Sequence, residues 1–274
     1  MVKIAVSGGH GPETPGKRSP DGFREAQFNH PTANLVIRYL NEYENVQTLK
    51  VFDESRDVPL AERTNKANSW GANLYVSVHY NALGSTWSDA HGIETLVYST
   101  STSSSNGFNV AQKVHAHLIA ATKRTNRGIK ARPELWEMRS TKMPSFLCEC
   151  GFMSNKEEKT LMASSSYQQL CARAIVEGIA EFYSLKKKVV EKPVSAPAPK
   201  TGETLYRVQV GAFGNLANAQ KFLVTVKAAG FSGIIKSSDG LHRIQVGAFS
   251  SKVNAEKLVS QLKAKGFTGA WITN

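Results

Sequence analysis

Cysteine is scarce in this chain of 274 residues, which contains only Cys148, Cys150 and Cys171. An odd and sparse set gives no basis for a disulfide framework, so we expect reduced thiols. Long hydrophobic runs are also missing, because no segment approaches the roughly 18 to 20 apolar residues that cross a bilayer. The first residues lack the basic start, apolar stretch and cleavage site of a secretory signal. We therefore expect synthesis in the cytoplasm and no membrane insertion.

Acidic residues are also few relative to basic residues. The chain has 22 Asp and Glu against 34 Lys and Arg, which gives a formal net charge of +12. The excess is uneven, at +2 over residues 1–185, +4 over 186–202 and +6 over 203–274. A cationic tail favours a polyanionic partner, which leaves nucleic acid, a membrane surface and an anionic cell-wall polymer as alternatives.

The end of the chain is an internal repeat. Residues 206–231 read YRVQVGAFGNLANAQKFLVTVKAAGF, and residues 242–267 read HRIQVGAFSSKVNAEKLVSQLKAKGF. Each copy predicts a strand, a helix and a short second strand. The order βαββαβ predicts a small α+β domain with an antiparallel sheet, both helices on one face and the other face open.

A stretch rich in Pro, Ala and Lys precedes the repeat. Residues 185–203 read LKKKVVEKPVSAPAPKTGE, where apolar periodicity stops, as in a semi-rigid spacer. We therefore predict a first domain over 1–184, a linker over 185–203 and a tail domain over 204–274.

The first domain alternates predicted strands and helices. The strands are expected at 2–6, 49–52, 73–78, 93–98 and 145–150, and the helices at 25–43, 59–70, 109–121 and 168–183. This alternation predicts a mixed α/β sheet flanked by helices. His10 and His79 each follow a strand, at the sheet edge where such folds gather ligands.

Two histidines and one carboxylate form the ligand set of hydrolytic zinc sites that leave a position for water. His10, Glu25 and His79 provide this set, and Glu149 lies on a strand with apolar neighbours, where burial would suit it to proton transfer. Spacing alone does not separate this reading from ordinary core side chains.

Local sequence strings sharpen the interpretation. The strings occur in the order SGGHG, GFREAQFN, SRDVPLAERTNKAN, SVHYNA, GIET, NRGIK and MPSFLCECGFMSN. From about residue 2 to 183 the chain resembles the zinc-dependent N-acetylmuramoyl-L-alanine amidases of the type 3 class. The resemblance implies one Zn²⁺ per catalytic domain and hydrolysis of the amide between N-acetylmuramic acid and L-alanine in peptidoglycan.

The resemblance also assigns roles to residues. It makes His10, Glu25 and His79 the zinc ligands, and Glu149 the carboxylate that takes a proton from water and passes it to the leaving amine. Relatives commonly carry an acidic residue where Ser7 stands, so the orientation of His10 must be provided otherwise.

Several polar residues near these strings have weaker assignments. Asn81 and Arg127 are candidates for substrate binding, with a structural turn as the alternative for Arg127. His30 is expected to be exposed, although its position after Glu25 leaves a place near the site open. Two further histidines, His115 and His117, diverge around a predicted helix and cannot readily share one ion.

Cys148 and Cys150 flank Glu149 on the predicted strand. A pair of thiols could ligate metal, but alternate strand residues share a face opposite to Glu149, so we expect both to pack in the core.

The tail resembles the SPOR family, whose members bind peptidoglycan glycan strands. The string QVGAF, present in both repeats, carries the resemblance. Gln209 and Gln245 are expected on the open sheet face as sugar-binding candidates, with solvation of the sheet as the alternative. An RNA-binding module is the rival for this topology, but its usual exposed aromatic residues are lacking on the strands apart from Tyr206, so no nucleic acid is expected.

Together these features predict a wall-lytic enzyme with peptidoglycan as partner, either a phage endolysin or an autolysin of sporulating cells. It would reach the wall by lysis or non-classical export. The competing hypothesis is a wall-binding protein that has lost amidase activity, which the complete set of four site residues disfavours.

Overall fold

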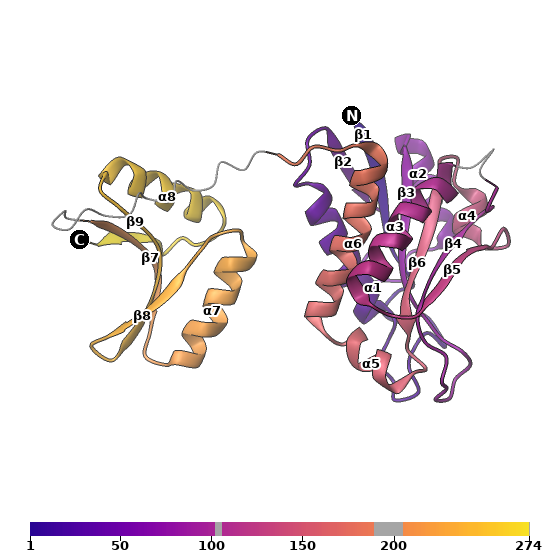
Figure 1. The fold of residues 1–274 in the computed structure, drawn as a ribbon, viewed down its shortest axis with the longest axis horizontal. Coiled ribbons are helices and arrows are strands. Elements are labelled where there is room, and N and C mark those ends of the chain that lie inside the picture. The colour runs from indigo at the N-terminus through magenta and orange to yellow at the C-terminus, as the bar shows by residue number, and fades with distance from the viewer. Residues whose placement is uncertain (102–105, 189–204, 274) are drawn as a thin grey trace. The chain divides into compact units, whose positions relative to one another are not determined.

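The computed structural model describes residues 1–101, 106–188 and 205–273, and it divides the chain into two compact units, Met1–Lys188 and Val189–Asn274 (Figure 1). Most of the predicted linker, from residue 189 onward, lies outside the described residues. Its first residues belong to the first unit, because the backbone N–H of Lys188 donates to the Glu42 carbonyl and that of Glu44 donates to the Lys186 carbonyl. The boundaries 184/185 and 203/204 stay a prediction.

The first unit is built on a six-stranded mixed sheet. Its strand order is β2 (Val46–Lys50), β1 (Val2–Gly8), β3 (Leu74–Asn81), β6 (Ser145–Phe152), β4 (Ile93–Val97) and β5 (Asn126–Ala131). All neighbouring pairs are parallel except β4 with β6. The predicted mixed α/β sheet is therefore confirmed, and the carboxyl ends of β1, β3 and β6 meet at one edge.

Helices cover both faces of this sheet. The helices are α1 (Ala26–Leu40), α2 (Leu60–Trp70), α3 (Asn106–Thr122), α4 (Trp136–Ser140), α5 (Lys156–Met162) and α6 (Ser165–Tyr183). Alternate residues of β1 face opposite layers. Ile4 and Val6 pack in the larger core with residues of α1, α3 and α6, whereas Ala5 packs with Ala67 of α2.

Three differences from the sequence-based elements have simple causes. Strand β2 begins and ends earlier than predicted, because its parallel pairing with β1 starts at Val2 opposite Val46 rather than where apolar residues gather. Strand β5 was not predicted, since it contains only two apolar side chains, Ile129 and Ala131, and all its residues are half-buried or exposed. Helices α4 and α5, with five and seven residues, are too short to show a helical period.

The tail unit has the predicted βαββαβ order. Its elements are β7 (Tyr206–Phe213), α7 (Leu216–Ala228), β8 (Ile234–Ser238), β9 (Leu241–Phe249), α8 (Lys252–Ala264) and β10 (Trp271–Thr273). The strands form an antiparallel sheet in the order β10-β7-β9-β8. Val208 and Ile244 pack with Val226 of α7 and Leu262 of α8. The two helices thus share one face, as predicted, and leave the other open.

Candidate functional site

His10 and His79 approach each other closely at the carboxyl ends of β1 and β3. Their rings are edge to face, with centroids 4.9 Å apart. His10 has a positive φ of 57°, which turns the chain sharply after β1. A Cβ on Gly9 would lie 2.1 Å from the His79 ring, so only glycine permits this approach. The SGGHG string therefore serves to bring the two imidazoles together.

Glu25 lies immediately before α1, and its carboxylate reaches both histidines. Its Oε1 lies 3.1 Å from His79 Nδ1, and its Oε2 lies 3.3 Å from His10 Nε2. Oε1 also accepts hydrogen bonds from Asn29 Nδ2 and from the backbone N–H of Tyr80. The carboxylate is thus fixed between the two rings.

These three side chains can hold a metal ion. One ligand atom from each of His10, Glu25 and His79 lies within 4.8 Å of the other two, and they are the one such group found among the described residues. Two imidazole nitrogens and a carboxylate oxygen match the donor types of a catalytic zinc site. The three residues predicted as ligands are therefore brought to one point.

Glu149 lies beside this group in the middle of the sheet edge. It pairs in register with His79 on β3 and with Glu94 on β4. Its side chain lines a cavity of about 250 Å³ together with His10, Glu25 and His79. Its buried Oε2 has no hydrogen-bond partner among the residues described. The carboxyl group thus lies at the cavity with one oxygen that no hydrogen bond among the described residues occupies.

The four groups have strongly displaced pKa values. Burial, together with the charges of Glu25 and Glu94, raises the pKa of Glu149 from 4.5 to about 8, although His79 acts in the opposite direction. Burial acts to raise the pKa of Glu25, but the hydrogen bond with His79 and the charge of His10 lower it to about 2. Burial also lowers the pKa of His10 to about 4. Burial acts to lower the pKa of His79 as well, but its contacts with the carboxylates of Glu137 and Glu25 raise it to about 10. Without a metal, Glu25 is ionised while Glu149 keeps its proton at neutral pH.

Comparison with known proteins identifies the family. The model of the family "N-acetylmuramoyl-L-alanine amidase" matches residues 4–181, and that of the SPOR domain matches residues 183–237 and 238–274. The chain belongs to the N-acetylmuramoyl-L-alanine amidase family. It is a peptidoglycan amidase with a SPOR tail, which confirms the activity and the tail family predicted from the sequence.

Relatives and solved structures agree with this assignment. The amidase CwlM of Bacillus licheniformis is 35% identical over 237 residues, which is 86% of this chain and 85% of the relative. The endolysin of Bacillus phage SPP1 is 34% identical over 74% of this chain and 75% of its own. The crystal structure of an N-acetylmuramoyl-L-alanine amidase from Clostridium difficile 630 superposes with a TM-score of 0.63 at 26% identity, covering 67% of this chain and 97% of that one. A bacterial amidase and a phage endolysin thus match at nearly equal identity, over 86% and 74% of this chain.

The two substrate-binding candidates of the amidase domain are joined by a carboxylate that the sequence analysis missed. Glu94 accepts from Asn81 Nδ2 at 2.9 Å, from Arg127 Nε at 2.9 Å and from Lys130 Nζ at 2.6 Å. Asn81 lines the cavity, whereas Arg127 stacks over Phe152 with its guanidinium carbon 4.6 Å from the ring centroid. The GIET string contains Glu94 and was the signal that could have revealed it.

Of the three other histidines that the sequence analysis discussed, one prediction is wrong and two are correct. His30 is buried rather than exposed, because the first turns of α1 pack against β1 and place its Nε2 2.8 Å from the His10 carbonyl oxygen. His115 contacts Thr95 and Asn126, and His117 contacts Glu181, so these two share no partner.

The cysteines have no ligand role in the described structure. Cys148, Cys150 and Cys171 are free and fully buried, and all three belong to the larger core. Burial raises the pKa of the Cys148 thiol well above its usual range. Both cysteines of β6 therefore pack as predicted, on the side opposite to Glu149.

The open face of the SPOR sheet carries the predicted glutamines and one aromatic residue. Gln209 pairs directly with Trp271 on β10 and with Gln245 on β9, so the three share a face. Gln209 is buried, with its Nε2 3.5 Å from Thr273 Oγ1, while Gln245 is half-buried and Trp271 is 37% exposed. Sequence reasoning missed Trp271, although strand alternation with Ile272 would have placed it outward.

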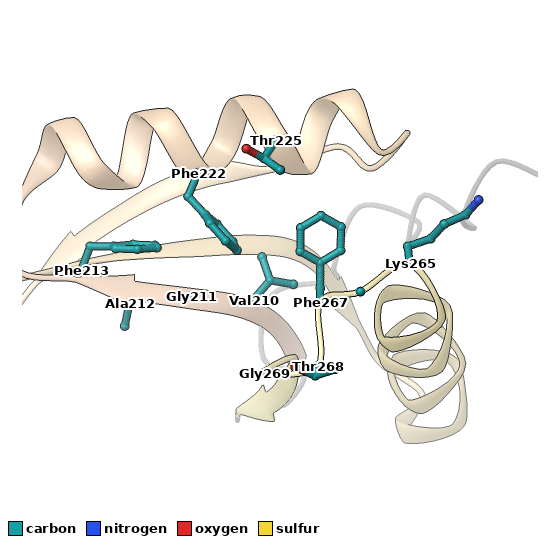
Figure 2. A pocket seen from close by; sticks show the side chains of 11 residues that line it. Val210, Gly211, Ala212, Phe213, Phe222, Thr225, Lys265, Phe267, Thr268 and Gly269 are labelled. Carbon is teal, nitrogen blue, oxygen red and sulfur yellow. The ribbon is translucent and has the colours of Figure 1, made fainter. Parts of the chain in front are cut away.

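The helix side of the SPOR sheet contains a hollow of about 550 Å³. Phe213, Phe222 and Phe267 turn toward it from β7, α7 and the segment after α8, whereas Ala212 points to the opposite side of the sheet (Figure 2). The lining side chains beyond these rings offer few polar groups, Thr225 and Lys265 among them. The amide groups that could bind sugar hydroxyls lie on the other face.

No helix in the described parts of the chain is long and apolar enough to cross a membrane.

Proposed function

We propose that this amidase is a zinc hydrolase in which His10, Glu25 and His79 bind one zinc ion and Glu149 carries the proton. The convergence of the three ligand atoms within 4.8 Å is the observation that supports this proposal most directly. The nitrogen and oxygen donors suit zinc, and the family is generally zinc-dependent. The orphaned Oε2 of Glu149 beside the group supports a role in the reaction rather than in the fold.

A bound zinc ion would supply Lewis-acid polarisation of the scissile carbonyl and acidify a water. Glu149 accepts the proton of the attacking water and delivers it to the amine of L-alanine as the amide bond breaks. Its raised pKa suits this exchange, since a group that both accepts and donates a proton works best with a pKa near the working pH.

The neighbouring polar residues hold the substrate. Asn81 lines the cavity, with its side chain oriented by Glu94, and presents its amide to the stem peptide. Arg127 is fixed by the same carboxylate and by Phe152, and its partly exposed guanidinium extends the polar surface. The stem peptide of peptidoglycan thus binds at the amidase domain.

The SPOR domain binds the glycan strand on its open sheet face. Trp271 offers an aromatic surface to sugar rings and the half-buried Gln245 offers an amide, while the buried Gln209 lies between them and supports this surface. With domains at 1–184 and 204–274 joined by residues 185–203, the tail raises the local concentration of the catalytic unit at its insoluble substrate.

Metal removal tests the catalytic proposal. Treatment of the full chain with a chelator should abolish release of stem peptides with a free L-alanine amine from purified sacculi, and stoichiometric zinc should restore it. His10→Ala should fail to regain activity with stoichiometric zinc. The proposal would be refuted if elemental analysis showed the protein to be free of metal and the protein still had full activity.

A binding assay tests the tail. The full chain should be pulled down by sacculi, whereas retention of an oligonucleotide with steep salt dependence would instead favour an RNA-binding tail.

A further inference from the structure

Glu137 lies behind His79, on the side away from Glu25. It comes from the short helix α4 and is buried, at 4% exposure. Its Oε1 accepts hydrogen bonds from Tyr75 Oη at 2.6 Å and Ser7 Oγ at 2.9 Å, and Ser77 Oγ lies 3.2 Å from its Oε2. Hydroxyls of β1 and β3 therefore hold this carboxylate in one orientation.

His79 stands between two carboxylates. Its Nδ1 faces Glu25 Oε1 at 3.1 Å, and its Nε2 lies 3.6 Å from Glu137 Oε2, just beyond hydrogen-bond length. This Nε2 is buried and has no hydrogen-bond partner among the residues described. A buried ring N–H without a partner is costly, and a small rotation of either side chain would bring the two atoms into contact.

We propose that Glu137 is a positioning residue that accepts the Nε2 proton of His79 and so keeps Nδ1 as the atom that faces the metal. The inference rests on the proposed zinc site. A histidine ligand commonly donates its second ring N–H to a carboxylate, which fixes its tautomer and orientation. Here the carboxylate comes from α4, a helix of five residues that the sequence analysis did not predict.

The same network reaches the loop that carries His10. Arg63, at 1% exposure, donates from Nη1 to Ser7 Oγ and to the Gly8 carbonyl, and its Nη2 lies 3.2 Å from the His10 carbonyl. Ser7 therefore links a buried cation to Glu137. The hydroxyl of Ser7 thus accepts from Arg63 and donates to the Glu137 carboxylate on α4.

Zinc affinity of the full chain tests the role of Glu137. Glu137→Gln preserves shape but removes the charge, and it should raise the zinc dissociation constant about 10- to 100-fold in competition with a chromophoric chelator. The visible spectrum of the cobalt-substituted variant should also change, because the ligand ring is no longer held.

Glu158→Gln is the matched control. Glu158 is an equally buried carboxylate of the same unit, but it accepts from the backbone N–H groups of Gly92 and Phe152. Its substitution should leave the zinc dissociation constant within about threefold, because this carboxylate contacts none of the three proposed ligands. A folded Glu137→Gln protein with wild-type zinc affinity and cobalt spectrum would overturn the positioning role.

A measurement on the unsubstituted protein covers the case in which Glu137→Gln does not fold. In the zinc-loaded chain with ¹⁵N-labelled histidine, the His79 Nε2 should carry a slowly exchanging proton and Nδ1 should be the metal-bound nitrogen. A metal-bound Nε2, or an Nε2 proton in fast exchange with water, would overturn the inference. Failure of the wild-type chain to bind zinc would instead refute the proposed function itself.

Discussion

Replacement of Glu149 by glutamine should separate catalysis from metal binding and from stability. Glutamine keeps the size of the side chain but cannot accept and return a proton at neutral pH. Loss of a positioned acid–base group typically costs about 10²- to 10⁴-fold in turnover. Zinc content should stay near one per chain, because Glu149 is not among the three converging ligands.

The same substitution should stabilise the metal-free protein. Burial and neighbouring charges raise the pKa of Glu149 from 4.5 to about 8, so the folded state keeps a proton that the unfolded chain releases above pH 4.5. Stability is therefore lost as pH rises from 4.5 to 8. At pH 7 this corresponds to up to about 3 kcal/mol, at roughly 1.36 kcal/mol per pKa unit. Glutamine carries no such penalty.

Two assays on the chelator-treated full chain check this reasoning. Urea unfolding at pH 7 should show Glu149→Gln more stable than wild type, and the gap should close near pH 4.5. Sacculus digestion after zinc is restored should show the loss of turnover. Glu158→Gln should keep wild-type turnover, because its carboxylate accepts from the backbone N–H groups of Gly92 and Phe152 and lies outside the reaction. Retention of more than a tenth of wild-type turnover by Glu149→Gln would refute the catalytic assignment, and an unchanged stability would refute the electrostatic one.

Further predictions concern the tail and a second buried histidine. Trp271→Ala should weaken sacculus binding by the full chain about tenfold, or roughly 1.4 kcal/mol. The control Val224→Ala, on the exposed side of α7, should leave binding unchanged. Equal effects of the two substitutions would exclude the open sheet face as the glycan-binding surface. Burial lowers the pKa of His115 from its ordinary value of 6.5. As the pH falls below 6.5, the unfolded chain therefore binds a proton that the folded chain does not bind, and the free energy of unfolding decreases. His115→Gln should flatten the dependence of the urea midpoint on pH between 6.5 and 5, and identical slopes would contradict this cause.

The metal-ligand candidates could be predicted from the sequence because their placement is local. His10 and His79 each follow a strand of apolar residues, and parallel strands end at the same sheet edge. Glu25 lies at the start of a long periodic helix that packs on β1. Pairing of β3 with β6 then places Glu149 beside His79. This alignment depends on the order of strands in the sheet, which the local sequence does not determine.

The parts that escaped prediction depend on tertiary contacts. Glu137 lies on a helix of five residues, and its hydroxyl partners are 60 to 130 positions away. The burial of His30 likewise follows from how α1 docks on β1, which the helical period alone leaves undetermined. From the sequence alone, charged and polar side chains are expected on the surface, so networks of buried polar residues are the features that are hardest to predict.

Three glutamates surround His79, and their partners set different tasks for them. Burial acts to raise the pKa of each, yet contact with His79 helps to lower those of Glu25 and Glu137 to about 2, whereas Glu149 keeps a pKa of about 8. The difference follows from hydrogen bonding, because Glu25 and Glu137 each accept several donors while Glu149 has an orphaned oxygen. Permanently ionised carboxylates suit ligation and orientation, and the carboxyl without partners suits proton transfer. Providing Glu149 with a hydrogen-bond donor would therefore lower its pKa and slow the reaction, even with every metal ligand in place.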